Sequence, residues 1–193
     1  MSDHDAWQEV TIPIREIVLR LGWWLVMAAV VLCVPMVWLW GVPYWPAWPW
    51  PAVWLGEIAR GGALLLLAYV VSVPIHEGLH ALGMLMTRTP RSEITFGARI
   101  LHGVVYVHCS AEMKLTSYRL VLILPVLLTG LLPAVWGLAG GNWWIVAYAY
   151  LMIVSAAGDL EMYWRLRRFP GDALTRDHPD LLGCEVLLPE SGS

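Results

Sequence analysis

Two histidines and a glutamate, His76, Glu77 and His80, lie within a hydrophobic run of the sequence that is long enough to cross a lipid bilayer. In a helix, residues four apart project from one face and are separated by about one turn. Two imidazoles at that spacing can bind one zinc ion, and the adjacent glutamate can then act as a base toward a zinc-bound water. Such side chains are costly at membrane depth, which favours a functional role for them.

A catalytic zinc ion takes three protein ligands and keeps one coordination position open. Asp159 is the best candidate for the third ligand, because the small residues before it allow two helices to approach closely. His76 lies ~22 Å along its hydrophobic run, and Asp159 lies ~24 Å along a later run that enters from the same face. Both groups are therefore expected at one level, in the cytoplasmic third of the bilayer.

Other interpretations of these residues stay open at this point. A histidine in an apolar helix is often a hydrogen-bonded core residue, and Asp159 could instead face water and pair with Arg165. His102 and His108, on the predicted hairpin, are each candidates for a substitute third ligand or an oxyanion donor. Pro125 falls near the same level, where a break in its helix would make room for a substrate backbone.

The composition is that of a membrane protein. Hydrophobic residues make up 59% of the 193 residues and charged residues 14%, whereas soluble domains carry about 25% charged residues. Tryptophans cluster near the ends of the apolar runs, as an aromatic belt at a membrane interface would require. These are Trp38, Trp40, Trp45, Trp48, Trp50, Trp143 and Trp144. A net charge of −3 with no basic cluster excludes a nucleic-acid-binding surface.

The pattern predicts one integral membrane domain over residues 1–193, an all-α fold with four transmembrane helices and a short β-hairpin between helices two and three. Each apolar run is long enough for a ~30 Å hydrocarbon core. The expected helices are 21–40, 61–86, 120–138 and 143–160, and the hairpin is 93–109 with a turn near His102-Gly103. A non-helical connector is expected over 41–58, a polar cytoplasmic tail over 165–193, and a kink or local unwinding at Pro74.

The distribution of basic residues predicts the orientation. Four spans place both termini on one side, and eleven of the twelve lysines and arginines fall in the termini or in the loop between helices two and three. Arg60 is the exception. The positive-inside rule therefore predicts a multi-pass protein of the cell membrane with both termini, and the hairpin, in the cytoplasm.

Several short motifs together resemble a known family. They are the HEGLH run, Val105-Tyr-Val-His-Cys109, Tyr118-Arg-Leu120, Ala157-Gly-Asp159 and Asp177-His-Pro179. The combination resembles the "putative zincin peptidase" family of small bacterial membrane proteins, which is similar in pattern to the site-two intramembrane proteases. The resemblance implies that His76, His80 and Asp159 bind zinc and that Glu77 is the catalytic base. Site-two proteases set their third ligand in Asn-Pro-x-x-Asp-Gly or Leu-Asp-Gly, whereas this chain has Gly-Asp-Leu.

The function expected from these features is intramembrane zinc-dependent proteolysis near the cytoplasmic face. Zinc would lower the pKa of its bound water, and Glu77 would accept the proton. The substrate would be a peptide or membrane protein, presented as a strand at the edge of the hairpin. The oligomeric state is not predicted.

A non-catalytic metal-binding scaffold, or pseudoprotease, is the main alternative. A metal transporter ranks last, because it requires polar groups through the bilayer and none is evident above Pro74.

Overall fold

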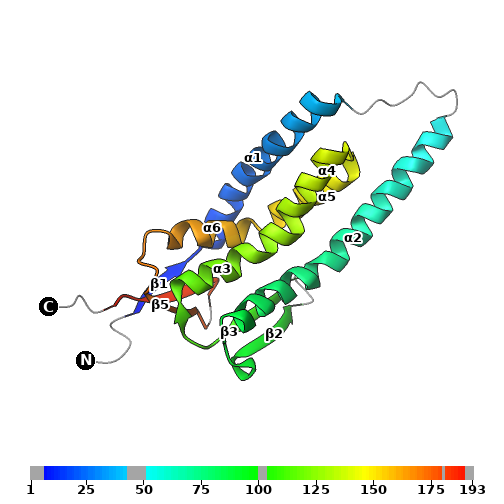
Figure 1. Ribbon diagram of the computed structural model, residues 1–193. Helices are drawn as coiled ribbons and strands as arrows, with labels where there is room; N and C mark the ends of the chain where they lie inside the picture. Colours follow the sequence, from blue (N-terminus) through cyan, green and yellow to red (C-terminus); the bar gives the residue numbers. More distant parts are fainter. Residues whose placement is uncertain (1–6, 43–50, 100–103, 180, 190–193) are drawn as a thin grey trace.

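The computed structural model describes residues 7–42, 51–99, 104–179 and 181–189 (Figure 1). Three helical stretches, Leu19–Trp40, Leu55–Met86 and Leu115–Gly140, are long and apolar enough to cross a membrane. A fourth span is formed if the bent pair Trp143–Ser155 and Ala157–Leu166 is counted as one. Only 6% of the apolar window in the second stretch is buried inside the protein. Because such a surface is stable against lipid and not against water, the chain is a membrane protein.

The helices form a bundle in which the α4–α5 hairpin lies between α1 and α2 (Figure 1). Helix α1 (Ile14–Trp40) packs on α4 (Leu132–Gly140) and α5 (Trp143–Ser155). Helix α2 (Pro51–Met86) packs on α3 (Leu115–Pro125) and α5. Helix α5 therefore contacts both long helices.

The predicted start of the second helix is wrong. Helix α2 begins at Pro51, so residues 51–58 of the expected connector are helical, and α1 likewise begins at Ile14 instead of residue 21. Proline is well tolerated in the first turn of a helix, because the N–H that it lacks would have no intrahelical partner there. Helix α2 also continues through Pro74 without the predicted unwinding. Three of the tryptophans assigned to the aromatic belt lie outside the described residues: Trp45, Trp48 and Trp50.

The third span is helical from end to end but changes its pitch. Helix α3 leads at Pro125 into a π-helical segment, η4 (Val126–Leu131), and then into α4. Proline cannot donate a backbone hydrogen bond, and a π-helical turn accommodates the disturbed ladder without a break. The Thr129 hydroxyl donates to the Pro125 carbonyl at 2.8 Å. The break expected at Pro125 is thus a change of helix type.

The fourth span is bent where the sequence suggested one helix over 143–160. Helix α5 ends at Ser155, and α6 (Ala157–Leu166) continues at an angle of 51°. The start of α5 is fixed by Asn142, whose side chain accepts hydrogen bonds from the backbone N–H groups of Trp144 and Ile145. The bend places Asp159 in the first turn of α6.

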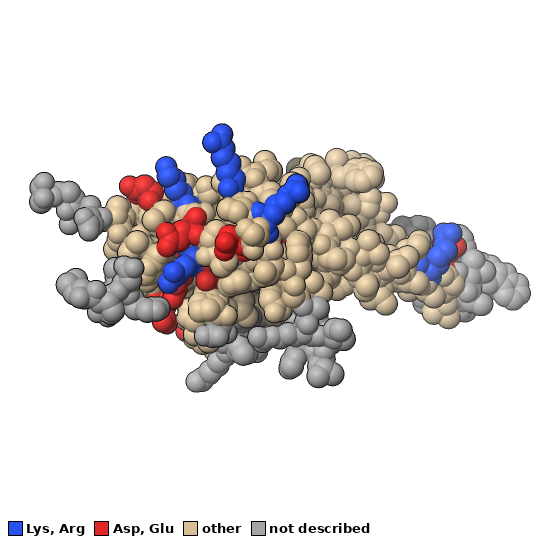
Figure 2. All heavy atoms as spheres, turned by 90° about the horizontal axis from the view of Figure 1, so that it is seen from below, with Lys and Arg blue, Asp and Glu red and all other residues tan. Residues whose placement is uncertain are grey.

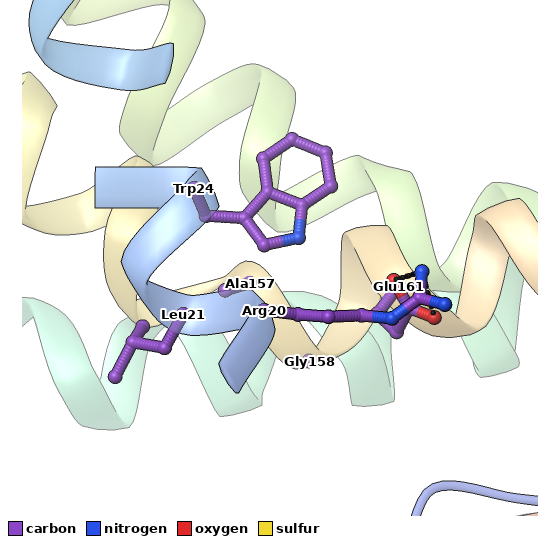
Figure 3. A pocket seen from close by; sticks show the side chains of 6 residues that line it. All are labelled: Arg20, Leu21, Trp24, Ala157, Gly158 and Glu161. Atoms are coloured by element: carbon purple, nitrogen blue, oxygen red, sulfur yellow. Dashed lines mark hydrogen bonds and ion pairs between the residues drawn. The ribbon is translucent and has the colours of Figure 1, made fainter. Parts of the chain in front are cut away.

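Ion pairs tie α1 to α6. Arg20 donates to the buried Glu161 at 3.0 Å (Figure 3). Arg165 bonds to both Glu161 and Glu16. These bonds leave Arg165 engaged away from Asp159, so the alternative pairing considered above is not formed. A small crevice beside the Arg20–Glu161 pair is lined by Arg20, Leu21, Trp24, Ala157, Gly158 and Glu161. It holds neither histidine of the HEGLH run.

The C-terminal segment, predicted to be a polar tail, is part of a four-stranded antiparallel sheet of order β1-β6-β5-β4. The strands are β1 (Trp7–Thr11), β4 (Met113–Lys114), β5 (Leu174–Asp177) and β6 (Gly183–Leu187). Alternate residues of β6, Cys184 and Val186, are fully buried in the core with Val10 and Leu115. Glu185, which lies between them, is buried as well and accepts from Arg176.

A second sheet has two antiparallel strands, β2 (Ile94–Arg99) and β3 (Val104–Cys109), preceded by the short helix η2 (Arg91–Glu93). These strands match the predicted hairpin, and its expected turn at His102-Gly103 lies outside the described residues. Both sheets lie at the end of the molecule where the two termini are found (Figure 1). Charged residues gather over that end, and a largely uncharged face extends from it (Figure 2).

Close contact between α2 and α3 depends on Gly83. A Cβ atom at this position would lie 3.2 Å from the Val121 Cα atom, which is backbone and cannot move aside cheaply. We expect Gly83→Val to cost roughly 1–3 kcal/mol of stability, as overpacking does in well-packed cores. The same change at Gly62, where nothing lies within 4 Å, is the control. Thermal unfolding in detergent micelles measures the stability of both variants. Equal unfolding midpoints for Gly83→Val and Gly62→Val would contradict the assigned packing.

Candidate metal centre

Side chains from α2 and α6 meet inside the bundle. The Nε2 atom of His76 lies 3.0 Å from Oδ2 of Asp159, and the Nε2 atom of His80 lies 3.5 Å from Oδ1. The two imidazole rings are 5.0 Å apart, edge to face. One nitrogen of each histidine and one carboxylate oxygen all fall within 4.8 Å of one another. Both histidines are buried, each 8% exposed.

The tautomer of His80 is set by its second hydrogen bond. Its Nδ1 atom lies 3.0 Å from the Val121 carbonyl oxygen on α3, and because a carbonyl only accepts, Nδ1 carries the proton. In the neutral ring the lone pair is then on Nε2, the atom that faces Asp159. A metal-ligating histidine typically donates its other N–H to a carbonyl in this way.

The donor set fits a zinc ion. The His80 lone pair and the Asp159 oxygen are both acceptors, so their approach is repulsive unless a proton or cation lies between them. Ligands bound to zinc at ~2.0–2.1 Å in a tetrahedral arrangement are about 3.3 Å apart. His76 Nε2 lies 3.0 Å from one Asp159 oxygen, and His80 Nε2 lies 3.5 Å from the other. Two imidazole nitrogens and one carboxylate oxygen are also a ligand set that catalytic zinc sites use.

Glu77 lies beside this cluster and is not part of it. Its side chain is partly exposed, unlike the two buried histidines. The Glu77 carboxylate lies close enough to His80, His76 and Asp159 to interact electrostatically with each of them, and the backbone N–H of Val107 on β3 lies near it. A carboxylate next to the three converging atoms, and still accessible, is placed as a general base requires.

Strand β3 turns its free edge toward this carboxylate. The Ser110 N–H donates to the Glu93 carbonyl, so in the register of this hairpin the even-numbered residues of β3 bond to β2. The N–H groups of Val107 and Cys109 consequently point away from β2. Asp177 accepts from the Cys109 N–H at 2.7 Å, and the Val107 N–H lies near the Glu77 carboxylate.

Asp177 joins three elements, a role that the sequence did not reveal. Besides the Cys109 N–H, its carboxylate accepts from the Tyr118 hydroxyl of α3 at 2.7 Å. Burial raises the pKa of Asp177 above its usual value. The Asp177-His-Pro179 motif marked this residue, but its partners are 59 and 68 positions away in the chain. Asp177 thus holds β3, and with it the Val107 N–H, against the bundle.

His108 and Pro125 are outside the cluster of three ligand atoms. His108 Nδ1 lies 3.8 Å from Oδ2 of Asp177, at the joint just described. Pro125 is fully buried in the third span and presents no surface to a substrate in this conformation. Their expected contacts with substrate therefore remain predictions.

A second group of metal-ligating types, Glu9, His178 and Glu185, lies on the four-stranded sheet. Here the backbone N–H of Leu181 donates to His178 Nδ1 at 2.9 Å, so the lone pair on Nδ1 is used. The neutral ring then carries its proton on Nε2, which is 4.0 Å from Glu9 and cannot ligate a metal in that form. This tautomer is opposite to that of His80, and the bond from Leu181 gives His178 a structural role in its loop.

Asp177→Ala should loosen β3 from the bundle, because the buried Tyr118 hydroxyl and Cys109 N–H would each lose their acceptor. We expect a loss of roughly 1–3 kcal/mol of stability. Faster hydrogen exchange at the Cys109 amide, measured by mass spectrometry, would locate the change. Asp172→Ala, at an exposed position, is the control. Equal exchange rates at the Cys109 amide in the two variants would show that Asp177 does not hold β3 against the bundle.

Comparison with known proteins gives a relative and a family. A relative from Pyrococcus woesei, named "Uncharacterized 24.7 kDa protein in gap 5'region", is 23% identical over 129 residues. The alignment covers 65% of this chain and 56% of the relative, so it spans little more than half of that protein. No solved structure matches the chain. The model of the family described as "Putative zincin peptidase" matches residues 69–174, which include all four of His76, Glu77, His80 and Asp159. Because this match covers more than half of the chain, the protein belongs to that zincin peptidase family.

Proposed function

We propose that the protein is an intramembrane zinc metalloprotease that hydrolyses a peptide bond near the cytoplasmic membrane face. One observation carries the proposal: the Nε2 atoms of His76 and His80 converge on the Asp159 carboxylate, with the partly exposed Glu77 beside them. Family membership supports a peptidase, and the apolar helices support a substrate within or next to the membrane.

In this proposal His76, His80 and Asp159 hold the zinc ion, which when bound supplies a Lewis acid that polarises the scissile carbonyl and lowers the pKa of water. Glu77 accepts the proton of the attacking water and delivers it to the leaving amine. The Val107 N–H, which lies near the Glu77 carboxylate, would help to orient it for both transfers. The Val121 carbonyl keeps the His80 lone pair directed at the metal.

The free edge of β3 offers a docking line for substrate. A peptide that adds as a strand to this edge would bond to the outward-pointing backbone groups of Val105 and Val107 that the Asp177 and Glu77 carboxylates leave open. Strand addition also unwinds a substrate helix, whose peptide bonds are otherwise shielded. Edge binding selects for an extended segment, so we propose a peptide or a membrane-protein segment as the substrate class.

The proposed orientation places both termini and the two sheets in the cytoplasm. Charged groups gather at the end with the sheets, as the positive-inside rule requires of a cytoplasmic end (Figure 2). At the other end of α2, Arg60 is paired with Glu57 at 2.6 Å, which offsets its charge. The cell membrane is the proposed location.

Glu77→Gln separates metal binding from catalysis. The amide keeps the shape of the side chain but cannot accept the proton of water, so we expect zinc content near wild type and a fall in cleavage of about 10²–10⁴-fold. The assay is reconstitution of the purified protein in liposomes with membrane proteins extracted from its own host, followed by mass spectrometry of new peptide termini.

Unchanged cleavage by Glu77→Gln would rule out the proposed base. Intact zinc in both proteins with no cleavage by either would instead support the non-catalytic metal-binding scaffold. The two outcomes are distinguished by measuring metal content and new termini on the same preparations.

Removal of a ligand tests the metal site itself. His76→Ala and Asp159→Ala should each lose stoichiometric zinc, measured by plasma mass spectrometry of protein purified without added metal. His108→Ala should retain it, because His108 lies beside Asp177 and away from the cluster. Zinc retained in Asp159→Ala and lost in His108→Ala would reassign the third ligand to His108.

A further inference from the structure

A pair of hydroxyl groups lies one helical turn from the metal centre, on the side away from the sheets. Ser72 of α2 and Tyr148 of α5 are hydrogen-bonded at 2.7 Å between their oxygen atoms. Ser72 is buried, with 7% of its surface exposed. It precedes Pro74, so the expectation of no polar groups above that proline is wrong. Polar pairs at membrane depth are costly enough to call for an explanation beyond packing.

His76 has an unsatisfied nitrogen on the same face of α2. Its Nε2 atom faces Asp159, but its Nδ1 atom is buried and has no hydrogen-bond partner among the described residues. If Nε2 gives its lone pair to a metal, Nδ1 must carry the proton and needs an acceptor. His80 has such an acceptor in the Val121 carbonyl, and His76 does not.

Ser72 is in a suitable place to be that acceptor. Residues four apart in a helix are neighbours, with Cβ atoms about 5–6 Å apart. Helical side chains lean toward the N-terminus, so the His76 ring extends over the turn that contains Ser72. A hydroxyl oxygen has two lone pairs and one proton, and the bond to Tyr148 uses only one of the three. Ser72 Oγ therefore keeps at least one lone pair for His76.

We propose that the Ser72–Tyr148 pair is a positioning element for the metal site, in which Ser72 accepts from His76 Nδ1–H directly or through one water. The inference rests on the proposed function, because it assumes that His76 ligates zinc through Nε2. Tyr148 fixes the Ser72 hydroxyl and so orients the acceptor. The pair would supply an acceptor for the Nδ1–H of His76, as the Val121 carbonyl does for the Nδ1–H of His80.

The test is zinc affinity of the full-length protein in detergent, measured by competition with a chromogenic chelator. Ser72→Ala removes the acceptor, and we expect its dissociation constant for zinc to rise about 10–100-fold, as is typical for loss of a partner behind a ligand. Tyr148→Phe, which removes one hydroxyl, should weaken binding in the same direction. Ser72→Thr retains the hydroxyl and should restore affinity.

Thr129→Val is the matched control, because the Thr129 hydroxyl is equally buried but bonds within its own helix to the Pro125 carbonyl. Its zinc affinity should equal that of wild type. Unfolding of the metal-free proteins gives the second readout. If Ser72→Ala and Tyr148→Phe lower that stability while zinc affinity is unchanged, the pair only packs the helices and the inference is refuted.

Failure of the proposed function gives a different result. A wild-type protein that binds no zinc would overturn both the proposed metal site and this inference. Zinc bound by wild type with the same dissociation constant as by Ser72→Ala would overturn the inference alone. Should Ser72→Ala fail to fold, Tyr148→Phe decides the question by the same measurement.

Discussion

Two imidazole nitrogens and a carboxylate approach within 3.0–3.5 Å inside an apolar bundle, and this convergence constrains the rest of the structure. With the His80 proton held on Nδ1, two acceptors face each other where few other groups can offset their repulsion. A cation between them turns the repulsion into attraction, and low polarity around the site strengthens that attraction. Without a cation the repulsion remains, so the helices must be held together by contacts outside the cluster.

The surrounding elements supply this support in separate ways. Gly83 lets α3 come close enough for the Val121 carbonyl to reach His80. The 51° bend between α5 and α6 brings Asp159 to α2, and ion pairs from α1 to Glu161 hold α6 in place. On the cytoplasmic side proposed above, Asp177 fastens β3, whose Val107 N–H lies near Glu77. The site is thus assembled from segments far apart in the chain.

The sequence predicted the features that follow from spacing along one helix. The distances along two hydrophobic runs placed His76 and Asp159 at the same depth, and the two side chains do meet. It did not predict the pairing of β1 with β6, because strands almost 180 residues apart leave only short, weak local patterns. The start of α2 was missed because Pro51 follows a run of prolines and tryptophans that is typical of a loop. The bend at Ala156 was not predicted, because no proline marks it; Ser155, whose hydroxyl donates to the Leu151 carbonyl, and Gly158 lie beside it.

X-ray absorption at the zinc edge, on wild-type protein purified without added metal, tests the central claim most directly. The account predicts a first shell of nitrogen and oxygen at about 2.0–2.1 Å, with the outer-shell scattering of two imidazole rings. A shell of sulfur at about 2.3 Å, a single imidazole, or no bound zinc would contradict it.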